Sequence, residues 1–128
     1  MGENSAQFHE AQDVLAQATQ ERHRAIASLM EELEAVDWYD QRVDATTDES
    51  LRAILAHNRD EEKEHAAMTL EWLRRNDATW DRMLRTYLFT EAPITEVEQE
   101  AEAGDTAPAA PGPASSLGIG ALSDKETL

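Results

Sequence analysis

Residues 62–65 read Glu-Lys-Glu-His, which places a carboxylate and an imidazole three positions apart in a segment with helical periodicity. Thirty positions upstream, Glu32 interrupts the apolar side of a second long amphipathic stretch. One glutamate from one helix and Glu-x-x-His from the next make up half of the ligand set of a di-iron carboxylate bundle. Two copies of the chain related by a two-fold axis would complete the set. The sequence therefore predicts a metal site that is shared between protomers.

The helical positions of these residues place both carboxylates on the packing side of their helices. At about 100° per residue, Glu32 points the same way as Leu29 and Val36, and Glu62 points the same way as Leu55. An unpaired charge on such a face costs several kcal/mol, and a bound metal cation removes that cost. Mixed oxygen and nitrogen donors suit iron or manganese better than a structural zinc. The alternative is a buried Glu–His or Glu–Arg pair that holds the two helices together.

Further residues on the first stretch could assist such a site. Tyr39 shares the face of Glu32, where it would give its hydroxyl to a ligand, serve as a one-electron reservoir, or pack as an ordinary core aromatic. Glu31, Glu34 and Trp38 cluster on a different face. Two carboxylates one turn apart, repeated by symmetry, would form an acidic funnel for hydrated cations, although a solvated charged face has the same pattern.

His57 and Glu61 form a second pair of donors, four positions apart on the second stretch and away from the direction of Glu62. Their spacing is that of hemerythrin-like sites. Those sites need more histidines than the four in this chain, and the four have unsuitable spacings. The sequence therefore argues against a hemerythrin-like centre.

Length and charge limit the classes of protein that fit. The chain has 128 residues, enough for one small domain. Its net charge of −16, from 27 acidic and 11 basic side chains, argues against nucleic acid or an anionic membrane as partner. The same charge suits the collection of cations or simple solubility. The chain contains no cysteine, and we see neither a signal peptide nor a membrane span, so we expect a soluble, cytosolic protein.

Hydrophobic periodicity predicts an all-α fold built on two long helices, the first from about His9 to Asp44. Its apolar residues recur at three- and four-residue spacing and predict one buried stripe. The stripe consists of Ile26, Leu29, Met30, Leu33 and Val36. Thr46 and Glu49 have the spacing of a capping box for the second helix, and the short connection predicts an antiparallel hairpin. Such a hairpin cannot cover its own apolar faces, so two copies are expected to form a four-helix bundle.

The chain changes character after the second helix. Residues 76–79 mark a break, residues 80–90 predict a shorter amphipathic helix, and residues 94–103 predict a further acidic helix. The composition of residues 104–116, which are mainly Gly, Pro, Ala and Ser, predicts a disordered linker. We therefore expect the helical domain to cover residues 9–103, after a disordered N-terminus of residues 1–8.

An apolar island follows the linker, within the terminal segment 117–128. It consists of Leu117, Gly118, Ile119, Gly120, Ala121 and Leu122. So short an island cannot form a core by itself. Its alternating large and small residues predict a linear peptide that inserts side chains into a groove of another protein, with a frayed terminus as the alternative.

Several of these motifs, in the same order, resemble those of the encapsulated ferritins. The resemblance rests on residues 30–39 (MEELEAVDWY), on parts of residues 55–72, on residues 85–91 (RTYLFTE) and on the terminal peptide 117–122 (LGIGAL). It spans nearly the whole chain except the N-terminus and the linker.

The resemblance implies a two-helix protomer that forms a ferritin-like bundle with a second copy, and dimers that assemble into a ring, typically a decamer. It implies a ferroxidase that oxidises Fe(II) with dioxygen or peroxide, at a centre with two irons per dimer interface. Matched by position, the ligands of that centre would be Glu32, Glu62 and His65, with Tyr39 close by.

Other matched positions carry further implications. Glu31 and Glu34 would form the acidic site where metal enters, and Trp38 its neighbouring aromatic. His57 and Glu61 would line further metal contacts. The terminal peptide resembles the targeting sequence that docks cargo inside an encapsulin shell, which implies iron storage in a compartment of the bacterial or archaeal cytoplasm. Two alternatives remain: a non-catalytic acidic helical adaptor that binds metal, and a rubrerythrin-like peroxidase.

Overall fold

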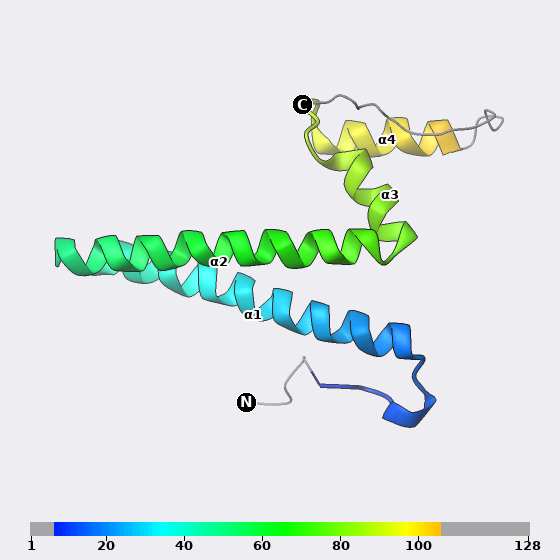
Figure 1. Ribbon diagram of the computed structural model, residues 1–128. Coiled ribbons are helices and arrows are strands. Elements are labelled where there is room, and N and C mark those ends of the chain that lie inside the picture. Colours follow the sequence, from blue (N-terminus) through cyan, green and yellow to red (C-terminus); the bar gives the residue numbers. More distant parts are fainter. Residues whose placement is uncertain (1–6, 106–128) are drawn as a thin grey trace. The chain divides into compact units, whose positions relative to one another are not determined.

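The computed structural model describes residues 7–105, and this part of the chain is helical, with no β-strand (Figure 1). The elements, in chain order, are η1 (Gln12–Val14), α1 (Gln17–Ala45), α2 (Glu49–Arg75), α3 (Ala78–Tyr87) and α4 (Ile94–Asp105). The predicted all-α class is confirmed. The chain divides into two compact units, Met1–Met83 and Leu84–Leu128. No helix in the described residues is long and apolar enough to cross a bilayer.

Helices α1 and α2 form the predicted antiparallel hairpin and run side by side (Figure 1). The turn between them is fixed by capping interactions. The Asp48 carboxylate accepts a hydrogen bond from the Leu51 amide at 2.9 Å and so begins α2. Arg52 donates to the carbonyls of Val43, at 3.1 Å, and of Thr46, which satisfies free acceptors at the end of α1.

The expected capping box between Thr46 and Glu49 is wrong. Asp48 is the N-cap of α2, and the Thr46 hydroxyl accepts instead from the Asp48 amide at 3.2 Å. Asp and Thr are both good caps, and the carboxylate directly before the helix lies closer to its free N–H groups. Glu49 in turn lies in the first turn of α2, where it pairs with Arg52.

The first helix also begins later than expected, at Gln17 instead of His9. Ala16 has extended backbone angles, and η1 precedes it. The Gln20 side chain donates to the carbonyl of Leu15 at 3.1 Å, so this backbone acceptor is satisfied without a longer helix. Phe8, which we expected in a disordered stretch, stacks on His23 with ring centroids 4.2 Å apart. Residues 1–6 lie outside the described residues.

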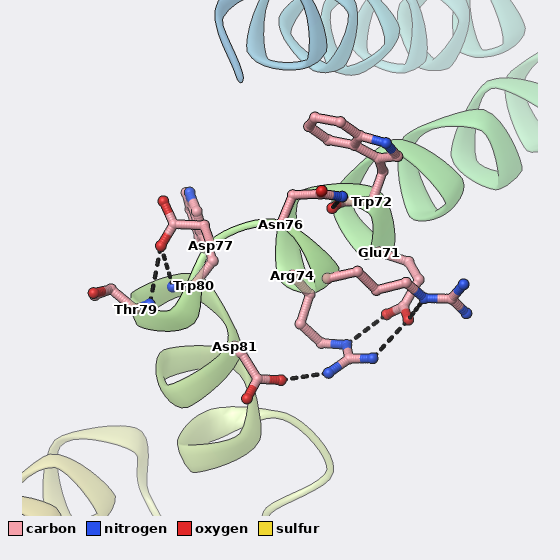
Figure 2. A network of polar contacts seen from close by, with 9 residues as sticks. Glu71, Trp72, Arg74, Asn76, Asp77, Thr79, Trp80 and Asp81 are labelled. Atoms are coloured by element: carbon pink, nitrogen blue, oxygen red, sulfur yellow. Dashed lines mark hydrogen bonds and ion pairs between the residues drawn. The ribbon is translucent and has the colours of Figure 1, made fainter. Parts of the chain in front are cut away.

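The predicted break after α2 is confirmed, and Figure 2 shows the polar network around it. Asp77 Oδ1 accepts from the amides of Thr79 and Trp80 at 2.9 and 3.0 Å, so α3 begins at Ala78. Arg74 donates Nε and Nη2 to the two carboxylate oxygens of Glu71, both at 2.8 Å, and contacts Asp81 of α3 through Nη1. These interactions stabilise the bend between α2 and α3.

Few side chains of the hairpin are buried within one protomer. Among the described residues, Ala66 and Leu73 are the buried ones, and both lie on α2. The predicted buried stripe of α1 is split: Leu29 and Val36 are half-buried, whereas the other three members are exposed. The exposed members are Ile26, Met30 and Leu33. The stripe is wider than the strip of α1 that α2 can cover, so part of it needs another partner.

In the second unit, α4 extends to Asp105, two residues into the stretch expected to be linker. The helix α3 ends at Tyr87, three residues before the expected end at Thr90. Phe89 adopts a left-handed backbone conformation, with φ of 62°, and this stops the helical hydrogen-bonding pattern. The rest of the predicted linker and the terminal peptide lie outside the described residues.

Candidate metal centre

Glu32 lies in the middle of α1, on the half-buried face that also carries Leu29 and Val36. One of its carboxylate oxygens, Oε1, is buried and has no hydrogen-bond partner. Burying a carboxylate oxygen without a partner is costly, because the water that solvated it is not replaced. This orphaned acceptor is the feature of the protomer that best fits a bound cation.

Glu62 and His65 lie one turn apart on α2, on or beside its half-buried face. Their side chains are 28% and 43% exposed, and His65 Nδ1 is 3.6 Å from Glu62 Oε1. This distance is too long for a good hydrogen bond, so the two groups lie together without satisfying one another. A carboxylate and an imidazole held in this way can approach a common ion.

Two ion pairs set the register of the hairpin and show which turns face one another. Asp40 of α1 pairs with Arg59 of α2, and Arg22 of α1 pairs with Asp77 just beyond α2. Glu32 is eight residues before Asp40 and ten after Arg22. Because the helices are antiparallel, the position opposite Glu32 is eight residues after Arg59 and ten residues before Asp77. Both counts give position 67 on α2, within one turn of His65. The three predicted ligands therefore come from neighbouring levels of the two helices.

One protomer does not gather a complete site. Within residues 7–105, no group of three or more His, Cys, Asp or Glu side chains is arranged to hold a metal ion. The hairpin presents Glu32 on one helix and the Glu62–His65 pair on the other as an incomplete set of donors. A closed coordination shell would need ligands from another molecule.

The remaining predicted site residues of α1 differ in how far they are exposed to solvent. Tyr39 is half-buried on the face of Glu32, and the Arg42 guanidinium lies 5.5 Å from the centre of its ring. Glu31, Glu34 and Trp38 are exposed. Their exposure agrees with the different helical face expected for them, and it fits a funnel and a solvated surface equally well.

His57 and Glu61 lie within reach of each other on α2, with Nε2 of the histidine 3.7 Å from Oε2 of the glutamate. Glu61 also faces His65, through Oε1 and Nε2 at 4.0 Å. The four-residue spacing from 57 to 61 to 65 is the sequence signal that identifies this column. His57 is strongly exposed, so the column runs from the candidate ligand His65 to solvent.

Large apolar side chains remain exposed on both sides of the hairpin. Ile54, Met68 and Trp72 lie on the flank of α2 toward which His65 points, and Met68 is 57% exposed. A shallow groove between α1 and α2 lies on the same side, lined in part by Ala25, Met68 and Trp72. Ile26, Met30 and Leu33 of α1 point to the opposite side.

Near the candidate ligands, the sequence analysis did not identify the ion pair between Arg59 and Asp40. The Arg59 guanidinium joins the two helices one turn from Glu62, with Nη1 3.2 Å from Asp40 Oδ1. The available signal was an arginine on the half-buried face of α2, three residues before the candidate ligand.

The described residues form an all-helical antiparallel hairpin that presents carboxylate and imidazole side chains from both helices. Comparison with known proteins identifies the family. Residues 7–91 match the family model EncFtn-like, and the chain belongs to this family.

Relatives and a solved structure agree with this assignment. The chain is 62% identical to the "Encapsulated ferritin-like protein" of Rhodospirillum rubrum, over 100% of this chain and 96% of the relative. It is 59% identical to the "Ferritin-like protein" of Thermotoga maritima, over 77% of this chain and 86% of the relative. A crystal structure of a protein from Nitrosomonas europaea is similar in fold, with a TM-score of 0.66 and 61% identity, over 68% of this chain and 96% of that one.

Proposed function

We propose that this protein is a ferroxidase, which oxidises Fe(II) to Fe(III) at a dinuclear centre formed between two protomers. The observation that carries the proposal is the buried, unpartnered Oε1 of Glu32, located opposite the turn of α2 that holds Glu62 and His65. Membership of the EncFtn-like family supports an iron-related role.

The ligand chemistry suits two iron ions as substrates. Two protomers together supply two copies each of Glu32, Glu62 and His65, the set used by di-iron carboxylate bundles. Four carboxylates offset the charge of two ferrous ions and stabilise two ferric ions more strongly, so they favour the oxidised state. Each pair of ferrous ions gives up two electrons. These reduce dioxygen to hydrogen peroxide, or hydrogen peroxide to water, with uptake of two protons.

Self-association follows from the apolar surface of the protomer. Two buried residues in the described part of the chain are too few to stabilise a domain. The flank with Met68 and Trp72 borders the candidate ligands and is the surface that we assign to the two-fold partner. The Met30 side of α1 is a second apolar surface. Two different self-association surfaces are what a closed ring of dimers requires, and the family resemblance implies a decamer.

Storage of the product belongs to a larger assembly. A relative that matches this chain along its whole length is named an encapsulated ferritin-like protein. We therefore assign the terminal peptide, residues 117–122, to docking in an encapsulin shell, where ferric iron would accumulate as mineral. The protein would then act in the bacterial or archaeal cytoplasm, inside that compartment. Glu31, Glu34 and Trp38 would guide iron toward the centre, and His57 with Glu61 would hold it transiently.

The test is anaerobic addition of Fe(II) followed by oxygen, with ferric species followed by absorbance. Glu32→Ala, Glu62→Ala and His65→Ala should each lower the initial rate about 10- to 100-fold, because each removes a ligand. Glu64→Ala is the matched control, since this exposed glutamate lies on the other side of the same turn. Unchanged turnover in all three ligand variants would refute the assignment.

The same measurement separates the proposal from its alternatives. A non-catalytic metal-binding adaptor would bind Fe(II) but show no ferric signal above the protein-free control. A rubrerythrin-like peroxidase would oxidise Fe(II) much faster with hydrogen peroxide than with dioxygen. Each outcome replaces the ferroxidase proposal with a defined function.

A further inference from the structure

Arg59 connects the two helices of the hairpin beside the candidate ligands. Its side chain is 23% exposed. Nη1 donates to Asp40 Oδ1 of α1 at 3.2 Å, and Nε donates to Asp60 Oδ1 of α2 at 3.1 Å. Lys63 Nζ lies 3.6 Å from the same Asp60 oxygen. The guanidinium is therefore oriented from its own helix and directed at a single acceptor on the other.

The apolar contacts of this hairpin do not by themselves fix how far α1 is shifted along α2. Hydrophobic contacts are non-directional, and in the described hairpin only Ala66 and Leu73 are buried. Arginines supply the directional contacts between the helices. Arg52 donates to α1 carbonyls at the turn, and Arg22 pairs with Asp77 at the open end, at 3.8 Å. The Arg59–Asp40 pair lies between these two and is one turn from Glu62.

A metal centre makes this register important. A shift of α1 by one residue would move Glu32 about 1.5 Å along the helix and about 100° around it. Metal ligands need to be held within about 0.5 Å of their productive positions. A protomer that supplies ligands from two helices must therefore fix the register of these helices before its partner completes the shell.

We infer that Arg59, through its bridge to Asp40, is a positioning residue that sets Glu32 of α1 against Glu62 and His65 of α2. The inference rests on the proposed dinuclear centre and extends it to residues that do not touch the metal. By its helical position, Arg59 lies on the side of the hairpin opposite to His65, so the bridge leaves the ligand side free. Asp40 and Asp60 compensate the cation, which would otherwise repel an incoming metal ion.

The charge of Arg59 and its positioning role predict opposite effects of its loss on the affinity for metal ions. Arg59→Met removes a positive charge about one turn from Glu62, so electrostatics alone predicts tighter binding of divalent cations. Loss of register predicts weaker binding. The conservative Arg59→Lys keeps the charge but cannot contact both carboxylates in the same planar geometry, so weaker binding in this variant reports position alone.

The experiment is an anaerobic titration of the full-length, metal-free protein with Co²⁺, read from its visible absorption bands. Arg59→Met, Arg59→Lys and Asp40→Asn should each weaken Co²⁺ binding about tenfold or more. The charge-swapped pair Asp40→Arg with Arg59→Asp should recover most of the loss. Arg75→Met is the matched control, because it removes an arginine of the same helix whose ion pair, with Glu71, lies within that helix. If the control loses as much thermal stability as Arg59→Met, it should still bind Co²⁺ with the affinity of the wild type.

Each outcome decides the inference. Unchanged or tighter Co²⁺ binding by Arg59→Met, or an equal loss of Co²⁺ affinity in Arg75→Met at equal stability, would overturn it. If Arg59→Met does not fold, Arg59→Lys and the charge swap give the decision. Wild-type protein that binds Co²⁺ but does not oxidise Fe(II) would end the ferroxidase proposal, and the Co²⁺ affinities of the Arg59 variants would still decide the positioning role. Wild-type protein without Co²⁺ binding would end both.

Discussion

The Glu32 carboxylate shows how a single residue can be informative when it is energetically out of place. Its Oε1 is buried and unpartnered on a face that is otherwise apolar. A residue kept at that position despite its cost is expected to serve the function of the protein and not its stability. The position of Glu32 could be predicted from helical periodicity, as could those of Glu62 and His65, because each interrupts a regular apolar pattern.

This cost leads to a prediction for the metal-free protein. Glu32→Leu should raise the free energy of unfolding by about 1–3 kcal/mol, because an apolar side chain replaces a buried acceptor without a partner. Glu31→Leu is the control, since its neighbouring carboxylate is exposed and should change stability by less than about 0.5 kcal/mol. Urea denaturation with a chelator present measures both. A Glu32→Leu variant that is less stable than Glu31→Leu would contradict the idea that this carboxylate is held at a cost.

The bridge between Arg59 and Asp40 could not be predicted in the same way. An ion pair within one helix follows from spacing, but a pair between helices depends on register, and many registers are compatible with the same apolar pattern. The register can be determined only from long-range contacts, which here are the ion pairs Asp40–Arg59 and Arg22–Asp77. The ion pairs that fix the register could therefore be found only in the structure.

At the scale of the helices, periodicity predicts the segments better than their ends. The hairpin and a break after α2 were predicted correctly, and α3 begins at Ala78, within the expected break of residues 76–79. The start of α1 was not predicted correctly, because Gln20 and Phe8 provide contacts that compete with a longer helix. The buried stripe of α1 was also overestimated, since a single neighbouring helix covers only about half of a wide apolar face.

Ion pairs at the bend between α2 and α3 should make the stability of the fold depend on pH under acidic conditions. Hydrogen bonds from Arg74, and secondarily from Arg75, lower the pKa of Glu71 from 4.5 to about 2. A lowered pKa in the folded state means that the carboxylate stabilises the fold above about pH 4.5 and that this contribution is lost as the pH falls toward 2. Because the Glu71 side chain is 40% exposed, solvent screening reduces the effect to about 1 kcal/mol.

Glu71→Gln tests this linkage. The variant should be less stable than the wild type by about 1 kcal/mol at pH 7, and the difference should shrink progressively from pH 4.5 to pH 2.5. Denaturant unfolding at several pH values, followed by far-UV circular dichroism, measures it. Glu64→Gln serves as the exposed control on the same helix and should show no such trend. A difference that stays constant with pH would show that packing, and not charge, explains the effect of Glu71.

For the whole molecule, the proposed function would make folding, assembly and chemistry depend on the same surfaces. The protomer buries little of its apolar surface, and the described part of the chain gathers no complete metal site. A partner that covers the flank with Met68 and Trp72 would both stabilise the hairpin and supply the missing ligands. Under the proposed function, oxidation and dimer formation should therefore have the same dependence on protein concentration.

Dilution gives a direct test of this coupling. The initial rate of Fe(II) oxidation per protomer should be constant while the protein is assembled and should fall toward the protein-free rate once dilution gives monomers, because a monomer supplies only half of the ligands. Sedimentation velocity at the same concentrations measures the fraction assembled. Met68→Glu, which places a charge on the exposed apolar flank, should move both curves to higher concentration together. Ser50→Glu adds the same charge at an exposed position at the start of α2 and should move neither. A monomer that retains the full rate per protomer would show that one chain contains the whole site, and the shared centre would have to be abandoned.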